Sequence, residues 1–156
     1  MTPTDHTPVP FSFRAQDCPL TLAEGMAEFA GAQPDLLAPD ERELAEFVRA
    51  HDACHVLFGL GTALDEEALA DTWTLLATDM SARRYAAFLR HKELAALFAS
   101  VGAWQLVTGT LRALPRIVRV LWRTRRMPAR WPFWGYGEHL HTPLAALRER
   151  FKIRVL

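Results

Sequence analysis

Apolar residues recur at helical spacing in successive stretches of this chain, and glycines or prolines separate the stretches. No stretch alternates apolar and polar residues as a half-buried strand does, and no internal repeat appears. The pattern therefore predicts an all-α fold, a single-domain bundle of several helices. The expected helices cover residues 21–33, 40–58, 62–80, 81–97, 101–127 and 142–150.

Length and composition limit the chain to one domain. Its 156 residues, half of them apolar, suffice for one hydrophobic core but not for two ordinary domains. Residues 1–19 contain four prolines and no helical period, so we expect an extended arm there and a folded domain over residues 20–156. No secretory signal and no long apolar run is visible, which favours a cytoplasmic protein. Cys18 and Cys54 are expected to remain reduced thiols.

Charge is distributed unevenly although the formal net charge is zero. Residues 1–80 hold three arginines against 15 acidic residues, whereas residues 81–156 hold 15 basic residues against three acidic ones. The balance argues against a nucleic-acid binder. The division implies either that the two halves pack face to face or that the second half meets an anionic partner.

Local signals mark several helix ends. Asp40 and Glu43 have the spacing of a reciprocal cap at the start of a helix. Gly59 and Gly61 accept left-handed backbone angles without steric cost and are expected to end that helix. Ser81 is a candidate cap for a later helix. The two glycines matter most, because a chain that reverses there returns the next helix along the first.

Four ligand-type side chains surround this reversal. His51, Asp52 and His55 share one arc of the helix over 40–58, because each residue turns about 100°. Two imidazoles four residues apart can hold one divalent ion, and a carboxylate adds a charged ligand. An antiparallel following helix would bring Glu67 back as a fourth ligand. We therefore predict a metal site formed by His51, Asp52, His55 and Glu67, and we assign the same four residues to catalysis.

The segment HDACHVLFGLGTALDEE resembles the signature of the coenzyme Q biosynthesis protein four family, an HDxxH motif followed by eleven residues and a glutamate. The motif falls on His51, Asp52, His55 and Glu67, and the C-terminal EHLHTPLAALRERFKI also resembles family sequence. The likeness covers roughly residues 40 to 156. One departure is Glu66, where the family commonly has glycine, so the turn before Glu67 is expected to be built differently.

The resemblance implies a function as well as a fold. It implies one bound divalent ion (zinc, iron or manganese), a groove for a polyprenylated aromatic lipid, and peripheral association with the inner face of the cell membrane. The implied activity is an oxidative decarboxylation that replaces the C1 carboxylate of a polyprenyl-hydroxybenzoate by a hydroxyl. The alternative is a scaffold that binds prenyl lipid and presents it to other quinone-biosynthesis enzymes, and a homodimer is left open.

Two further segments bear on partners. Five arginines of the helix over 101–127 fall within about 80° of one another, opposite an apolar side, which is typical of a membrane-surface helix or of a surface helix that pairs with the acidic half. The arginines are Arg112, Arg116, Arg119, Arg123 and Arg126. The aromatic stretch 127–137 that follows is expected to be an irregular loop.

A phosphohydrolase is a weaker alternative function, suggested by the dipeptide His51-Asp52. Phosphohydrolase sites of that kind need additional, distant His and Asp ligands, which this chain does not offer in the required arrangement.

Overall fold

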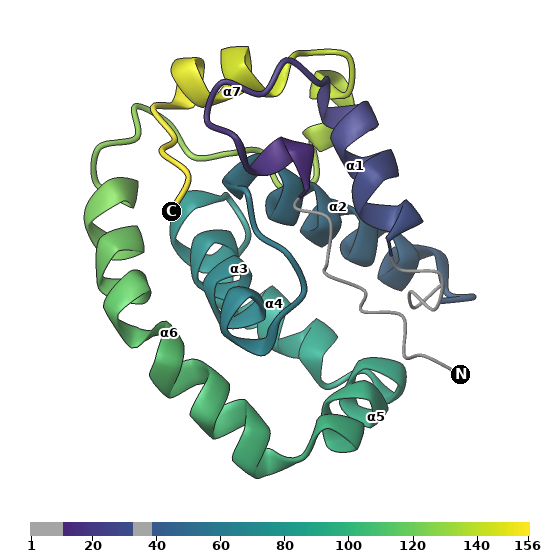
Figure 1. The fold of residues 1–156 in the computed structure, drawn as a ribbon. Helices are drawn as coiled ribbons and strands as arrows, with labels where there is room; N and C mark the ends of the chain where they lie inside the picture. The colour runs from purple at the N-terminus through teal and green to yellow at the C-terminus, as the bar shows by residue number, and fades with distance from the viewer. Residues whose placement is uncertain (1–10, 33–38) are drawn as a thin grey trace, which may run out of the picture.

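The computed structural model describes residues 11–32 and 39–156, and this part of the chain is an assembly of helices (Figure 1). Seven α-helices and two short 3₁₀ helices occur in it, and no strand, so the all-α prediction is confirmed. The α-helices are α1 (Leu22–Gly31), α2 (Arg42–Phe58), α3 (Leu64–Ala77), α4 (Ala82–Leu89), α5 (Lys92–Val101), α6 (Ala103–Thr124) and α7 (Leu144–Phe151). The 3₁₀ helices are η1 (Ser12–Arg14) and η2 (Tyr136–His139).

Helix α2 lies at the centre of the fold and packs against α1, α3 and α7. Its C-terminal half is almost entirely buried, from Ala53 to Phe58. Phe58 stacks on Trp73 of α3 with ring centroids 4.4 Å apart, and both rings are fully buried. Burial of two large aromatic side chains contributes several kcal/mol, so the contact fixes α3 against α2.

The N-terminal segment contributes to the core within its described part. Of the arm expected over residues 1–19, residues 1–10 lie outside the described residues. Ser12–Arg14 form η1, whose Phe13 is fully buried between neighbouring aromatic rings. Cys18 is also buried, and both cysteines are free thiols, as predicted. The folded body thus begins before residue 20, because the apolar side chains of this proline-rich stretch are drawn into the core.

A buried arginine joins the two ends of the chain to α2. Arg148 of α7 is fully buried and donates hydrogen bonds to the carbonyl oxygens of Val56 and Leu57 in the last turn of α2. It also donates to the carbonyl oxygens of Phe13 and Ala15. The last carbonyls of a helix have no partner within it, and the guanidinium supplies donors to two of them. Burial lowers the pKa of Arg148 to about 10, which leaves it charged at neutral pH.

The helix ends predicted at Gly59 and at Ser81 are confirmed, whereas Gly61 does not adopt a left-handed conformation and the predicted acidic cap is absent. Gly59 ends α2 with a left-handed φ of 73°, and Ser81 Oγ accepts from the backbone N–H of Arg84, both as predicted. The reciprocal cap predicted from Asp40 and Glu43 is wrong, because α2 begins at Arg42 without a side-chain cap. The cap instead occurs at α1, where Thr21 and Glu24 bond each other's backbone N–H.

The second half of the chain forms α4, α5 and α6. The single helix expected over 81–97 is divided at His91, whose backbone is extended and whose Nε2 lies 2.8 Å from a carboxylate oxygen of Glu41. Helix α6 continues through Pro115 and packs along α3, with α3 on its inner side in Figure 1. None of the described helices is long and apolar enough alone to cross a membrane. As a pair, α5 and α6 satisfy that criterion, with a bend of 83° between them.

Candidate metal centre

The turn between α2 and α3 brings the predicted ligands together. Gly59 reverses the chain in its left-handed conformation, and five residues later α3 begins. The two helices pack side by side, so the first turns of α3 return along the last turns of α2. Each of His51, His55 and Glu67 can place one ligand atom within 4.8 Å of the other two. The antiparallel return of Glu67 is therefore confirmed.

The separations between these atoms fit an ion better than a hydrogen bond. Glu67 Oε2 lies 3.4 Å from His55 Nε2 and 3.8 Å from His51 Nε2. An N–H···O bond spans about 2.7–3.2 Å. Ligand atoms around a tetrahedral zinc ion, each about 2.0–2.2 Å from it, lie roughly 3.4 Å apart. The donors thus already stand near the spacing of a coordination shell, and the residues fit a bound divalent ion.

The backbone of the turn orients His55. Its Nδ1 lies 2.9 Å from the carbonyl oxygen of Gly61, and the side chain is 2% exposed. A carbonyl oxygen can only accept, so in the neutral ring Nδ1 carries the hydrogen. Nε2 then presents its lone pair toward Glu67. Metal-binding histidines generally have such a partner, which fixes both the tautomer and the ring orientation.

Glu66, the residue that departs from the resembled family, stabilises this turn. Its Oε2 accepts from the backbone N–H of Gly61 at 3.1 Å and from Arg14 at 2.8 Å. A Cβ on Gly61 would lie 2.7 Å from that same oxygen, so a side chain at this position would displace the carboxylate from the turn. The side chain of Glu66 therefore holds the loop whose carbonyl orients His55.

Asp52 lies beside the site but outside the group of three. Its carboxylate does not join the donor atoms of His51, His55 and Glu67. Burial, with a smaller contribution from the charge of Glu67, raises the pKa of Asp52 to about 6 against the attraction of the two imidazoles. The half-buried carboxyl thus interacts electrostatically with His51, His55 and Glu67. Its roles as a ligand and in catalysis stay predictions.

Sequence reasoning missed Asp71, which lies one helical turn after Glu67 on α3. Asp71 Oδ1 is 3.8 Å from His51 Nε2 and accepts a hydrogen bond from the hydroxyl of Tyr85 on α4. Burial raises the pKa of Asp71, while His51 opposes the shift. The four-residue spacing from Glu67, which places both carboxylates on one face of α3, is the signal that would have revealed it.

The site is electrically suited to a cation. Burial alone would raise the pKa of Glu67, but His51 and His55 outweigh it and hold that pKa below its usual range. Burial opposes a charge on His51, yet Glu67, Asp71 and Asp52 together raise the pKa of its imidazole. Three carboxylates thus surround two imidazoles. An ionised carboxylate and neutral imidazoles are the forms that bind a metal.

Aromatic rings enclose the two histidines. Phe29 of α1 stacks on the ring of His55 at 5.0 Å, and Phe47 of α2 is nearly parallel to the ring of His51 at 6.2 Å. Phe47 in turn contacts Tyr85 and Phe88 of α4. Cys54 is fully buried, and burial raises the pKa of its thiol to about 12, so the thiol stays protonated and packs in the core. Apolar walls of this kind keep a metal site dry and strengthen its electrostatics.

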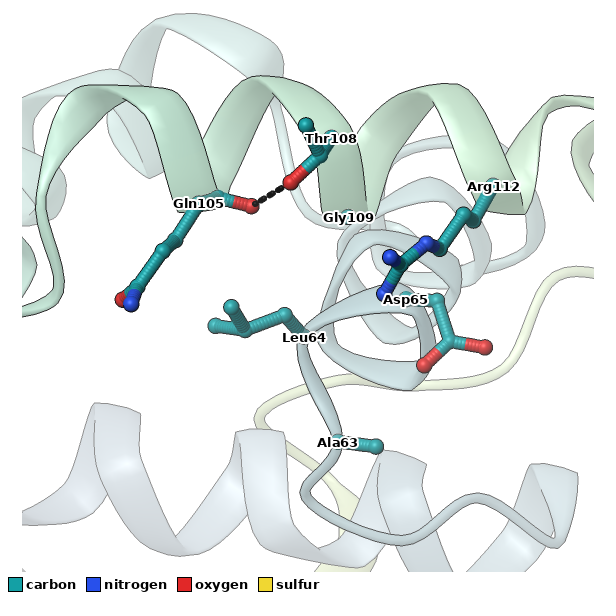
Figure 2. A pocket seen from close by; sticks show the side chains of 7 residues that line it. All are labelled: Ala63, Leu64, Asp65, Gln105, Thr108, Gly109 and Arg112. Atoms are coloured by element: carbon teal, nitrogen blue, oxygen red, sulfur yellow. Dashed lines mark hydrogen bonds between the residues drawn. The ribbon is translucent and has the colours of Figure 1, made fainter.

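A separate cavity of about 450 Å³ lies between the start of α3 and α6. Figure 2 shows Arg112 and Asp65 on one side of it, with Gln105 and Thr108 on the other. Gly109 allows the two helices to approach, since a Cβ there would lie 2.9 Å from the Cβ of Leu64. Four polar side chains line this cavity, so it is not the apolar slot that a prenyl tail requires.

Comparisons with known proteins found no match to this chain among family models, curated proteins or solved structures. The site is therefore interpreted from its own geometry. Two imidazoles and one carboxylate form the donor set of catalytic zinc sites and of non-haem iron centres, both of which keep positions open for water or substrate.

Proposed function

We propose that this chain is a metal-dependent enzyme of ubiquinone-type biosynthesis. The reaction proposed is the oxidative decarboxylation of a polyprenyl-hydroxybenzoate, in which the ring loses its C1 carboxylate as carbon dioxide and gains a hydroxyl. The observation that supports it most is the convergence of His51, His55 and Glu67 on one point. The HDxxH motif, eleven residues and glutamate to which these residues belong is the basis of the resemblance.

The proposed roles follow from the chemistry of the side chains. His51, His55 and Glu67 would hold a zinc, iron or manganese ion, which supplies Lewis acidity toward a phenolate or carboxylate and, with iron or manganese, reactivity with dioxygen as the oxidant. Asp52 carries a carboxyl whose pKa of about 6 suits proton transfer near neutral pH. Phe29 and Phe47 are buried against the two imidazoles and make the surroundings of the proposed metal apolar.

Metal content is the first test of the proposal. The purified protein should carry close to one divalent ion per chain, and His51→Ala, His55→Ala and Glu67→Ala should each lower the occupancy, because each removes one ligand. His91→Ala is the matched control, since that imidazole lies outside the cluster and contacts Glu41. Equal metal content in all four variants would exclude this site.

Activity is tested in a bacterial strain that lacks its own ring-decarboxylating step. The unaltered chain should restore quinone synthesis, and Asp52→Asn and Glu67→Gln should abolish the rescue while the variants stay folded. His91→Gln should rescue as well as the unaltered chain. Rescue by variants without metal would exclude metal-assisted catalysis. A chain that never rescues, yet copurifies with prenylated intermediates and partner enzymes, would favour the scaffold function instead.

A further inference from the structure

Two acidic side chains of α3 face the two histidines of α2. Glu67 and Asp71 lie one helical turn apart, which places both on one face of α3, and His51 and His55 are related in the same way on α2. Glu67 Oε2 lies 3.4 Å from His55 Nε2, and Asp71 Oδ1 lies 3.8 Å from His51 Nε2. The two helices therefore set two carboxylates opposite two imidazoles.

His51 lies between the two carboxylates. Its Nε2 is 3.8 Å from Glu67 Oε2 and 3.8 Å from Asp71 Oδ1, and both separations exceed the roughly 2.7–3.2 Å of an N–H···O bond. Its buried Nδ1 has no hydrogen-bond partner among the described residues either. A buried polar atom without a partner costs free energy, so hydrogen bonding does not account for the position of this imidazole. The spacing leaves room for an ion beside Nε2, with a carboxylate oxygen on either side.

Tyr85 holds the carboxylate of Asp71 in this place. The hydroxyl of Tyr85 on α4 donates to Asp71 Oδ1, the same oxygen that faces His51. Tyr85 is 4% exposed and packs on Phe47, so its ring is fixed in the core. A carboxylate oxygen has two lone pairs and can accept this hydrogen bond while it binds a metal. Carboxylates that bind metals are generally hydrogen-bonded in this way, because the bond fixes their orientation.

The cluster carries negative charge without a permanent cation. Within the described part of the chain, Glu67 and Asp71 form ion pairs only with histidines, and neither pairs with a lysine or an arginine. Carboxylates that are partly removed from water are costly unless a cation compensates them. One divalent ion would neutralise both carboxylates, because imidazoles bind a metal as neutral ligands.

We propose that Asp71 is a fourth protein ligand of the divalent ion that the other three residues would hold, and that Tyr85 positions its carboxylate. This inference rests on the metal site of the proposed function and adds a ligand that the HDxxH motif, eleven residues and glutamate do not include. Asp71 lies outside the compact group of His51, His55 and Glu67, so the ion would draw its carboxylate inward.

Asp52 is the competing candidate for the fourth ligand. It follows His51 on α2 and interacts electrostatically with both imidazoles, but among the described residues it forms no ion pair with either of them. Asp71 approaches Nε2 of His51 from the facing helix, on the side where Glu67 also lies. Binding through Asp71 leaves the carboxyl of Asp52 free for the proton transfer proposed for it.

Titration of the full chain with Co²⁺ tests the proposal, because the visible absorption of bound Co²⁺ depends on the number and type of its ligands. Asp71→Asn should lower the affinity at least about a hundredfold and change the spectrum, since loss of a group that only orients a ligand already costs about 10–100-fold. Tyr85→Phe should lower the affinity about tenfold and keep the spectrum. Asp52→Asn removes the same charge nearby and should lower the affinity about fivefold or less, with the spectrum unchanged.

Two further measurements keep the test independent of how well Asp71→Asn folds. Asp71→Glu retains a carboxylate and should bind Co²⁺ more tightly than Asp71→Asn. A crystal structure of the unaltered chain loaded with Co²⁺ should place an oxygen of Asp71 about 2.0–2.2 Å from the ion.

The outcomes separate this inference from the proposed function. Equal affinities and equal spectra of Asp52→Asn and Asp71→Asn would overturn the inference, as would a loaded structure in which Asp71 does not touch the ion. If His55→Ala loses the ion and Asp71→Asn keeps it unchanged, the inference alone fails. If the unaltered chain takes up no ion, the inference and the metal-dependent function fail together.

Discussion

At the residue scale, the sequence predicts the three converging ligands because their spacing carries the geometry. His51 and His55 share a helix face by period alone, and Gly59 dictates the reversal that returns Glu67. Spacing from Glu67 could also have indicated Asp71, but the contact of Tyr85 with Asp71 could not be predicted in this way, because it joins α4 to α3 through the packing of the fold. Asp52 lies on the same arc of α2, but its carboxylate does not join the ligand atoms of His51, His55 and Glu67.

Zinc binding should strengthen with pH because His51 must lose its proton to bind. In the metal-free protein the carboxylates of Glu67 and Asp71 raise the pKa of His51, although burial opposes this. The attraction between protonated His51 and these carboxylates therefore stabilises the folded state below the ordinary histidine pKa of about 6.5. This stabilisation is lost as the pH rises through the higher pKa of His51 in the folded state. A bound metal reverses this dependence of stability on pH, because it binds the neutral ring of His51.

We therefore expect the thermal stabilisation by zinc to grow between about pH 5.5 and pH 8, with affinity rising up to about tenfold per pH unit while His51 titrates. Differential scanning fluorimetry with and without zinc measures this. In His51→Gln the affinity should be lower and its pH dependence shallower. An affinity that does not change with pH would show that no histidine deprotonates on binding.

At the element scale, helix positions follow from apolar period, while caps and breaks depend on partners distant in the sequence. Asp40 and Glu43 have the spacing of a reciprocal cap, yet neither side chain caps the start of α2, and α1 holds the reciprocal cap instead. The break at His91 coincides with its contact to Glu41, 50 residues away. Pro115 does not end α6, because the packing along α3 outweighs one lost backbone hydrogen bond.

Arg148 stabilises the end of helix α2, although the sequence pattern did not single it out. Its guanidinium satisfies the last carbonyls of α2, the helix that carries both histidines. Arg148→Met should lower the free energy of unfolding by about 3 kcal/mol, because it removes the donor to the carbonyl oxygens of Phe13 and Leu57 and leaves those of Val56 and Ala15 with a backbone N–H alone. Urea denaturation measures the loss.

Arg150→Met on the same helix is the control for this prediction, since Arg150 is exposed and its substitution should change stability by about 0.5 kcal/mol or less. If both variants unfold at the same urea concentration, the carbonyl contacts of Arg148 add nothing to stability. Zinc affinity of Arg148→Met should fall as well, because the last turn of α2 positions His55.

At the scale of the whole molecule, some arginines of the basic half pair with the acidic half and others do not. Arg84 bonds Glu43 and Arg116 bonds Asp65, so part of the basic half does face the acidic half. Arg112 and Arg119 on α6 have no such partner among the described residues. The sequence predicted both alternatives without separating them, because which arginine faces inward depends on how α6 is rotated against α3.

This division predicts that salt affects stability weakly. The ion pairs between the two halves are largely exposed, with the side chains of Arg84 and Glu43 50% and 61% accessible. Exposed pairs contribute about 0–1 kcal/mol each and are screened by salt. Raising NaCl from about 50 mM to about 500 mM should therefore lower the free energy of unfolding by only about 1–2 kcal/mol. Urea denaturation at several salt concentrations measures this dependence.

The variant in which Arg84 and Glu43 are both replaced by Gln should show a smaller salt dependence, because one screened pair is gone. A loss of several kcal/mol in salt would instead mean that attraction between the halves maintains the fold.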